Sequence, residues 1–171
     1  MENPKDIFKK TYDKYVKKIY RFIFLKVSSK EAAEDLTSET FLRFLNTLEN
    51  SKEEVKNEQA FLYRIARNLT TDYYREKGKA NFVSVDSFPI ADSKESLEER
   101  IMVNSDMDMV KASLAGMKEE HQNVIIWRYL DEMSIPEIAG IIEKTEPATR
   151  VMLHRALNSL KKTMNNKHKT A

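Results

Sequence analysis

The residue types best suited to binding chemistry in this chain lie near its C-terminus. From Pro147 onward there are six cations and no Asp or Glu, although 29 cations against 27 anions leave the whole chain at only +2. At helical spacing the apolar residues of this stretch share one side, and arginine, histidine and asparagine side chains occupy the other. Such a face can hydrogen-bond base edges and phosphates. It consists of Val151, His154, Arg155, Asn158 and Lys162, with Arg150 and Lys161 on its flanks.

The residues before this face predict how it is held. Ser134 and Glu137 form a capping-box pattern that opens a short helix. Thr145 suits the cap of the next helix, and Pro147 is tolerated in its first turn, where the missing N–H loses no partner. Two short helices joined by a tight turn form a helix-turn-helix, whose second helix enters the major groove of DNA. A solvated amphipathic hairpin with ordinary surface lysines would leave the same pattern.

A second basic face is predicted between Ala60 and Lys79, where five cations stand against two anions. A basic stripe with a central asparagine and neighbouring tyrosines can hold a phosphate backbone and hydrogen-bond an exposed base. The apolar side of this helix is predicted from Leu62, Ile65, Ala66, Leu69 and Tyr73. The opposite stripe consists of Arg64, Arg67, Asn68, Thr71 and Arg75.

The composition favours helices as the elements that position both faces. Of 171 residues only three are glycine and four are proline, and one third are charged, which predicts an all-α chain. A polar loop is expected over Glu49–Glu58. The expected N-terminal helices run over Pro4–Val27, from a capping box at Ser28 and Glu31 to about Leu48, and from about Gln59 to Lys77.

The chain is predicted to form two small helical domains joined by a flexible acidic linker. Residues 79–96 lack a helical period and contain Pro89 with scattered Ser, Asp and Asn. Helices resume near Leu97, with breaks near Gly116 and Asp131. Residues 81–100 carry two cations and five anions. We therefore assign residues 1–80 to the first domain, 81–100 to the linker and 101–171 to a second domain that contains the helix-turn-helix.

Several classes of protein are disfavoured by what the sequence lacks. There is no cysteine, which excludes disulfides and thiolate metal sites. The N-terminus lacks the apolar core of a signal peptide, and no apolar run approaches membrane-spanning length. No glycine-rich phosphate loop occurs, and no nucleophile stands out. We expect a cytoplasmic protein that is not an enzyme, with no membrane insertion, no catalytic residue, no metal site and no cofactor.

Three segments together resemble the extracytoplasmic-function sigma factors, group IV of the sigma-70 family of bacterial transcription initiation factors. They are EDLTSETFLRFL (34–45), AFLYRIARNLTTDYYR (60–75) and the stretch from His121 to Lys162. The resemblance implies a factor that binds core RNA polymerase and directs it to particular promoters. It implies that the second helix docks on the clamp helices of the largest polymerase subunit. The polar side of that helix shows Asp35, Glu39, Leu42, Arg43 and Asn46.

The resemblance also implies two promoter-reading ends. The third helix and the loop Glu49–Glu58 before it would melt the −10 element and capture an unpaired base, through Arg64, Arg67, Asn68, Thr71 and Arg75. The helix-turn-helix would read the −35 duplex. The residues facing that duplex would be Arg150, Val151, Met152, His154 and Arg155, with Asn158 on the same face. The resemblance further implies control by an anti-sigma factor.

Two departures from the family pattern bear on the helix-turn-helix. Glu143 stands where glycine is common, which removes the favoured left-handed cap of the first helix, and Pro147 stands where a small residue is common. Val151 and Met152 replace the polar or basic residues of many relatives. An apolar side chain can contact a thymine methyl but cannot pair with guanine. This pair is therefore expected to shift the −35 preference.

Two other classes stay open from the residues. A helix-turn-helix regulator without direct core polymerase binding would explain the C-terminal half, but not the surface from Asp35 to Arg43. Such a regulator would bind duplex promoter DNA unaided. A helical metal-carboxylate enzyme is poorly supported, because there is no Glu-x-x-His motif and the three histidines lie far from the acidic cluster in sequence. The acids it would use are Glu31, Glu34, Asp35 and Glu39.

Overall fold

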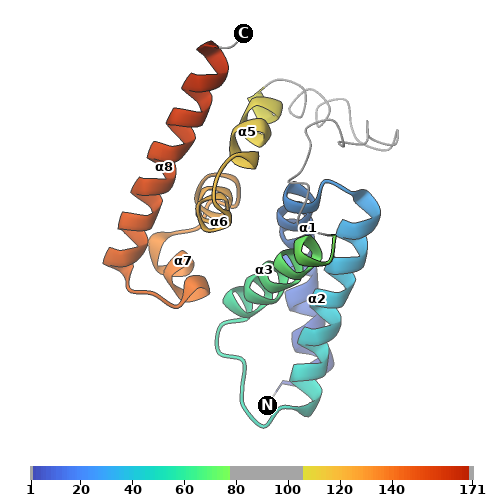
Figure 1. The fold of residues 1–171 in the computed structure, drawn as a ribbon. Coiled ribbons are helices and arrows are strands. Elements are labelled where there is room, and N and C mark those ends of the chain that lie inside the picture. Colours follow the sequence, from blue (N-terminus) through green and yellow to red (C-terminus); the bar gives the residue numbers. More distant parts are fainter. Residues whose placement is uncertain (1, 78–105, 170–171) are drawn as a thin grey trace. The chain divides into compact units, whose positions relative to one another are not determined.

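The computed structural model describes residues 2–77 and 106–169, with side chains described for 2–77 and 111–165 (Figure 1). Every regular element in these ranges is a helix, as the composition predicts. The proposed linker and the helix start near Leu97 lie outside the described residues. The elements are α1 (Pro4–Val27), α2 (Lys30–Asn50), α3 (Glu58–Glu76), α5 (Asp106–Ala115), α6 (Glu119–Ile125), the π-helix η2 (Ile126–Leu130), α7 (Ile135–Ile142) and α8 (Glu146–Lys169). They form two compact units, with α1 to α3 in one, and α5, α6, η2, most of α7 and α8 in the other.

In the first unit each of the three helices packs against the other two (Figure 1). The helices meet because each presents an apolar stripe at helical spacing. Burying a large apolar side chain stabilises a fold by about 1.5–3 kcal/mol relative to exposure. The free energy gained by burying this core therefore holds the three helices together, although their outer surfaces are charged. Its fully buried side chains include Ile19, Phe22, Ile23, Phe44, Leu62 and Tyr63.

The junction between α1 and α2 corrects the predicted capping box at Ser28 and Glu31. Ser28 adopts a left-handed conformation with φ of 54°, and its N–H donates to the Phe24 carbonyl at 2.9 Å, so it ends α1. The next residue, Ser29, caps α2 by accepting the Ala32 N–H at 3.2 Å. Glu31 consequently falls one position too early for a capping box. The pattern was misread by one residue because two adjacent serines divide the two caps between them.

The buried side of α3 is wider than the sequence predicted. Tyr63 and Thr70 are fully buried, whereas Ile65 and Tyr73, both assigned to the apolar side, are only half-buried. The reason is that α3 packs against both α1 and α2. A helix covered by two neighbours buries a broader arc than a single apolar stripe.

In the second unit α8 packs along α6 and α5. The side chain of Gln122 ties the turn between α5 and α6, donating to the carbonyls of Leu114 at 2.6 Å and Met117 at 3.2 Å. After α6 the backbone widens into η2, where the Asp131 N–H donates to the Ile126 carbonyl five residues back at 3.0 Å. The sequence predicted breaks near Gly116 and Asp131, and both are observed, but it gave no sign of the π-helix. In this segment Trp127 is fully buried and Tyr129 is 52% exposed.

The turn between α7 and α8 is made without glycine. Glu143 ends α7 with φ of 56° and ψ of 43°, and its N–H donates to the Ala139 carbonyl. The Lys144 N–H also reaches the Ala139 carbonyl, at 3.2 Å. Glutamate thus adopts the left-handed conformation that the family pattern leaves to glycine. A side chain with a β-carbon is strained in this conformation.

Replacing Glu143 by glycine should stabilise the second unit. Relief of the left-handed strain, less the extra chain entropy of glycine, predicts a gain of about 0.5–1 kcal/mol. Denaturant unfolding of Glu143→Gly beside the natural chain measures it, and Glu143→Asn should fall between the two because asparagine tolerates this conformation. A loss of stability in Glu143→Gly would mean that contacts of the glutamate side chain outweigh the backbone strain.

Candidate nucleic-acid interface

The helix-turn-helix caps lie where the sequence predicted them. At the start of α7, Ser134 accepts the Glu137 N–H at 3.2 Å and the Glu137 carboxylate accepts the Ser134 N–H at 3.1 Å, which completes the capping box. Thr145 caps α8 by accepting the Ala148 N–H at 3.2 Å. Pro147 lies in the first turn of α8, as expected. These local bonds set where each helix begins and therefore which side chains face outward.

The inner side of α8 is buried through Thr149, Leu153 and Ala156, with Leu157 and Leu160 half-buried. The outer side is exposed, and among its described residues Val151, at 50% exposure, is the exposed large hydrophobic side chain. Met152 is half-buried, so it presents less surface than its neighbours. The remaining members of the predicted face and its flanks are all exposed: Arg150, His154, Arg155, Asn158, Lys161 and Lys162.

One ion pair occupies part of this face. The guanidinium of Arg150 lies 3.9 Å from the Glu146 carboxylate one turn earlier, and both side chains are at least half exposed. Exposed pairs of this kind contribute at most about 1 kcal/mol. A phosphate could therefore replace the carboxylate at small cost.

The five residues of the basic stripe of α3 differ in their exposure to solvent. Asn68 and Arg75 are exposed, whereas Arg64, Arg67 and Thr71 are half-buried. The Thr71 hydroxyl donates to the Arg67 carbonyl at 3.0 Å, so its proton is used within its own helix. Of the five predicted residues, Asn68 and Arg75 are thus the most accessible to a ligand.

One of the five cations counted between Ala60 and Lys79, Lys77, lies at the C-terminal end of α3 and outside the predicted stripe. Lys77 caps α3 and places its ammonium 5.0 Å from the centre of the Tyr73 ring. A hydrogen bond with Tyr73 raises the pKa of Lys77 above its ordinary value. This bond favours the charged form of Lys77, whose ammonium lies beside Tyr73, on a different side of α3 from Asn68 and Arg75.

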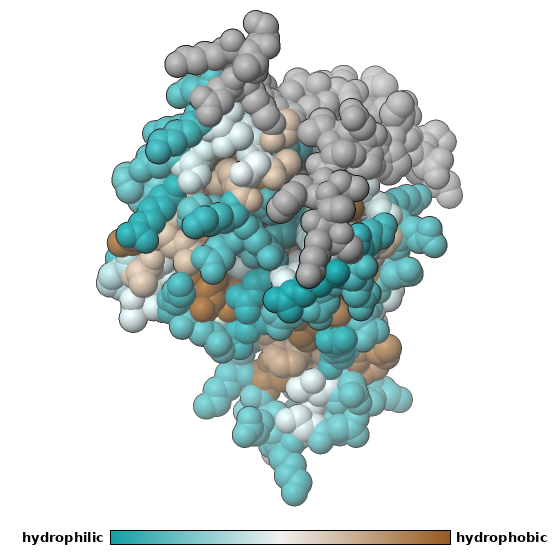
Figure 2. Space-filling model, in the orientation of Figure 1, coloured by the Kyte–Doolittle hydropathy of each residue, from teal (hydrophilic) through white to brown (hydrophobic). Residues whose placement is uncertain are grey.

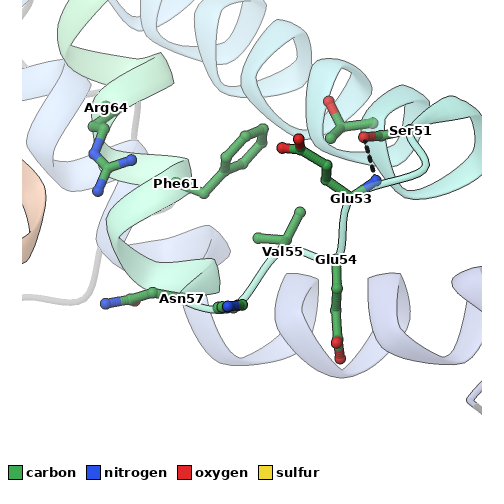
Figure 3. Close-up of a pocket in the computed structure, with 9 residues that line it drawn as sticks. Ser51, Glu53, Glu54, Val55, Asn57, Phe61 and Arg64 are labelled. Carbon is green, nitrogen blue, oxygen red and sulfur yellow. Dashed lines mark hydrogen bonds between the residues drawn. The ribbon is translucent and has the colours of Figure 1, made fainter.

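A hollow of about 580 Å³ lies between the end of α2, the loop 51–57 and the start of α3 (Figure 3). The ring of Phe61 and the side chain of Val55 give it apolar walls. Figure 3 shows the Glu53 carboxylate directed toward Phe61, and the Glu54 carboxylate directed away from it. The sequence predicted a loop here but no pocket. The lining residues are Thr47, Ser51, Glu53, Glu54, Val55, Lys56, Asn57, Phe61 and Arg64.

The loop around this hollow is fixed at both ends. At its start the Ser51 N–H donates to the Thr47 carbonyl at 2.9 Å, and the Ser51 hydroxyl accepts the Glu53 N–H at 3.1 Å. At its end the Asn57 side chain accepts the Ala60 N–H at 3.0 Å and caps α3. Asn57 therefore holds the loop to the first turn of the helix.

A long-range hydrogen bond anchors the start of α3 itself. The buried hydroxyl of Thr11 on α1 donates to the Glu58 carboxylate at 2.8 Å. Hydrogen bonds to charged groups are stronger than those between neutral groups. This bond spans 47 residues of sequence, so no local pattern could reveal it.

The rear of the hollow is continuous with the aromatic core. The rings of Phe61 and Phe44 lie 6.0 Å apart, and Phe44 in turn lies 6.2 Å from Phe8. Tyr12 and Phe41 extend the cluster, with their ring centres 4.9 Å apart. Aromatic pairs at these separations attract one another beyond simple burial. Phe61 is half-buried, so it belongs both to the core and to the wall of the hollow.

A third surface runs along α2, opposite the buried rings of Phe41 and Phe44. Leu42 is 60% exposed, which makes it the most exposed large apolar side chain among the described residues. Arg43 donates to the Glu39 carboxylate at 2.9 Å one turn earlier. Asp35 and Asn46 are exposed, and Glu39 is half-buried. An apolar side chain amid polar neighbours suits a non-obligate protein interface.

Figure 2 shows hydrophobic side chains only in small, separate patches on the face drawn. No helix in the described ranges has the length and apolarity needed to cross a membrane. Among the described residues, no group of three His, Asp or Glu side chains is close enough to hold a metal ion.

Models of two protein families match this chain. Sigma-70 region 2 matches residues 11–80, and Sigma-70, region 4 matches residues 107–160. The ECF RNA polymerase sigma factor BldN of Streptomyces coelicolor is 28% identical over 156 residues, which cover 91% of this chain and 59% of BldN. The RNA polymerase sigma factor YlaC of Bacillus subtilis is 28% identical over 162 residues, which cover 94% of this chain and 93% of YlaC.

Two solved structures share the fold. CnrH, in complex with the cytosolic domain of CnrY, matches with a TM-score of 0.70 and 17% identity, over 95% of this chain and 90% of CnrH. The sigma factor RpoE of Bartonella quintana, in complex with the anti-sigma factor NepR, matches with a TM-score of 0.67 and 22% identity, over 92% of this chain and 96% of RpoE.

Replacing Thr11 by valine tests the anchor of α3. The change keeps the shape but removes the donor to Glu58, so the free energy of unfolding should fall by about 1–2 kcal/mol. Amide hydrogen exchange should also quicken at Ala60 and Phe61, in the first turn of α3.

Thr40→Val is the matched control, because Thr40 is equally buried but donates only to the Leu36 carbonyl of its own helix. It should lose less stability and leave exchange at the start of α3 unchanged. Equal effects of the two variants would remove the special role of the Thr11 bond.

Proposed function

The chain belongs to the sigma-70 family, among its extracytoplasmic-function sigma factors, and from this premise we propose how it works. It is a transcription initiation factor that binds core RNA polymerase and directs the enzyme to particular promoters. The observation that carries the proposal is the order of the surfaces. The α2 stripe and the α3 pocket lie within the region 2 match, and the helix-turn-helix lies within the region 4 match. Such a factor supplies specificity and catalyses no reaction itself.

The stripe of Asp35, Glu39, Leu42, Arg43 and Asn46 on α2 is proposed to contact the clamp helices of the largest polymerase subunit. Leu42 is the anchor of this contact, because burying an exposed leucine removes apolar surface from water. The Arg43–Glu39 pair lies beside it and can exchange partners with charges on the polymerase. A polar rim around an apolar anchor gives an interface that forms and dissolves with each round of initiation.

The α3 stripe and the pocket before it are proposed to take the melted −10 strand. The charge of Arg75 attracts the phosphate backbone and the Asn68 amide can donate to it, with Arg64, Arg67 and Thr71 less accessible beside them. An unpaired base enters the hollow and stacks on Phe61, since an aromatic ring is the usual partner of an unpaired base. Phe61 rests on Phe44, so the stacking surface is already in place before DNA arrives.

The outer face of α8 is proposed to enter the major groove of the −35 element. Arg155, His154 and Asn158 offer hydrogen bonds to base edges, and Arg150 can release Glu146 to hold a phosphate. Val151 is exposed enough to contact a thymine methyl. Met152, being half-buried, supports the face more than it reads the bases. The −35 sequence is thus expected to carry thymine opposite Val151.

The proposal extends to control of the factor. CnrH and RpoE are each seen with a second protein, and for RpoE that protein is an anti-sigma factor. We place this chain in the cytoplasm with core polymerase and promoter DNA, held inactive by an anti-sigma factor until needed. A helix-turn-helix regulator that ignores polymerase would explain α7 and α8, but it would leave Leu42 and the α3 pocket without a use.

Replacing Leu42 by aspartate should weaken binding to core polymerase by about tenfold or more, because it puts a charge where an apolar anchor is buried. Titration of labelled protein with purified core enzyme measures the change. Val151→Asp places the same charge on α8 and should leave core affinity unchanged while it weakens −35 binding. If both variants bound core as the natural chain does, α2 would not be the docking helix.

Replacing Arg155 and Asn68 should separate the two promoter contacts. In reconstituted holoenzyme Arg155→Ala should weaken closed-complex binding by about 1–3 kcal/mol, whereas Lys118→Ala, also exposed but outside α8, should change little. Asn68→Ala should leave closed-complex binding intact and slow strand opening, followed with permanganate on unpaired thymines. Equal opening rates for Asn68→Ala and the natural chain would remove Asn68 from the −10 site.

A further inference from the structure

We propose that Glu53 makes the α3 pocket selective for an unpaired base that carries an exocyclic amino group and discriminates against thymine. The inference rests on the proposed function, because it assumes that this hollow receives a base of the −10 strand. It adds the chemical class of base, which neither the family matches nor the loop sequence specifies.

The pocket places one carboxylate beside its stacking surface. Glu53 and Glu54 are neighbours in the loop, but only the Glu53 side chain is directed toward the Phe61 ring (Figure 3). The Glu53 backbone is held by its N–H bond to the Ser51 hydroxyl at 3.1 Å. Ser51 itself is tied to α2 through the Thr47 carbonyl. The carboxylate therefore starts from a fixed point on the rim.

A base stacked on Phe61 would turn an edge toward this carboxylate. An ionised carboxylate only accepts hydrogen bonds. Cytosine and adenine present an amino group on that edge, and guanine presents an amino group beside a ring N–H; the pairing of a glutamate with the cytosine amine is an established mode of base reading. Thymine offers a single ring N–H flanked by two carbonyl oxygens, which a carboxylate repels. The pocket can thus reject thymine as well as attract an amine.

The preference against thymine becomes stronger once a base has entered the hollow. Glu53 is exposed in the free protein, where water satisfies its oxygens. A stacked base displaces part of that water, and a carboxylate left facing a carbonyl then loses hydrogen bonds that it does not regain. Its neighbour Glu54 also lines the hollow but points away from the ring. Glu120 on α6 is likewise exposed and lies outside every surface proposed above, so it is a control of identical chemistry.

The test uses reconstituted holoenzyme and a promoter library with every position of the −10 element randomised. Transcripts are sequenced for the natural chain, Glu53→Gln and Glu120→Gln. At one position the natural chain should disfavour thymine by about fivefold relative to an amino-bearing base, the value of one modest hydrogen-bond preference. Glu53→Gln should lose this preference at that position alone, because a carboxamide also donates and so accepts thymine. Glu120→Gln should select as the natural chain does.

Ser51→Ala is a second variant. It keeps the Glu53 carboxylate but removes the hydroxyl that accepts the Glu53 N–H. It should weaken the discrimination without abolishing it. Thermal unfolding of all variants accompanies the selection, and since these side chains are exposed, their melting curves should match that of the natural chain.

Promoters with one abasic site at each −10 position separate the inference from the function beneath it. If an abasic site blocks opening at one position, yet thymine there is accepted equally or Glu53→Gln selects as before, the role of Glu53 is overturned and base capture stands. If no abasic site impairs opening, the pocket takes no base, and both proposals fail together.

Discussion

The packing of Phe61 against Phe44 is the contact on which the N-terminal half of this protein depends. The Phe61 ring contacts Phe44 of the aromatic core shared by α1, α2 and α3, and it also lines the hollow next to the loop 51–57. The ring is held by the core, so it does not have to be ordered by a ligand, and preorganised groups bind with less entropic cost. The Thr11–Glu58 bond and the Asn57 cap serve the same end, because they fix where α3 begins.

In the second unit the position of α8 depends on the backbone conformation of the turn before it. The recognition face of α8 is useful only if the helix starts at the correct residue and turns its apolar side inward. Thr145 sets the start, Thr149 and Ala156 are buried on the inner side, and Glu143 accepts a strained conformation so that the turn stays short. Strain at a non-glycine residue persists where surrounding structure determines it. Here the N–H groups of Glu143 and Lys144 both reach the Ala139 carbonyl.

Much of this was readable from sequence because it is local. Helix α1 runs over Pro4–Val27 as predicted, and the Ser134–Glu137 box and the Thr145 cap each join residues three apart. The errors arose where local patterns allowed two answers, as at Ser28 and Ser29, or where two neighbours widened the buried side of α3. The pocket was out of reach, because it depends on contacts such as Phe44 with Phe61, which are distant in sequence. The roles of individual residues toward polymerase and DNA stay predictions.

Mapping transcript start sites on genomic DNA tests the central claim most directly. Core polymerase is incubated with fragmented genomic DNA, with and without the purified chain, and the 5′ ends of the transcripts are sequenced. The account predicts that the chain produces a limited set of discrete starts, each preceded by the same pair of elements at constant spacing. If the chain left the starts made by core enzyme unchanged while it bound duplex DNA unaided, it would not act as an initiation factor.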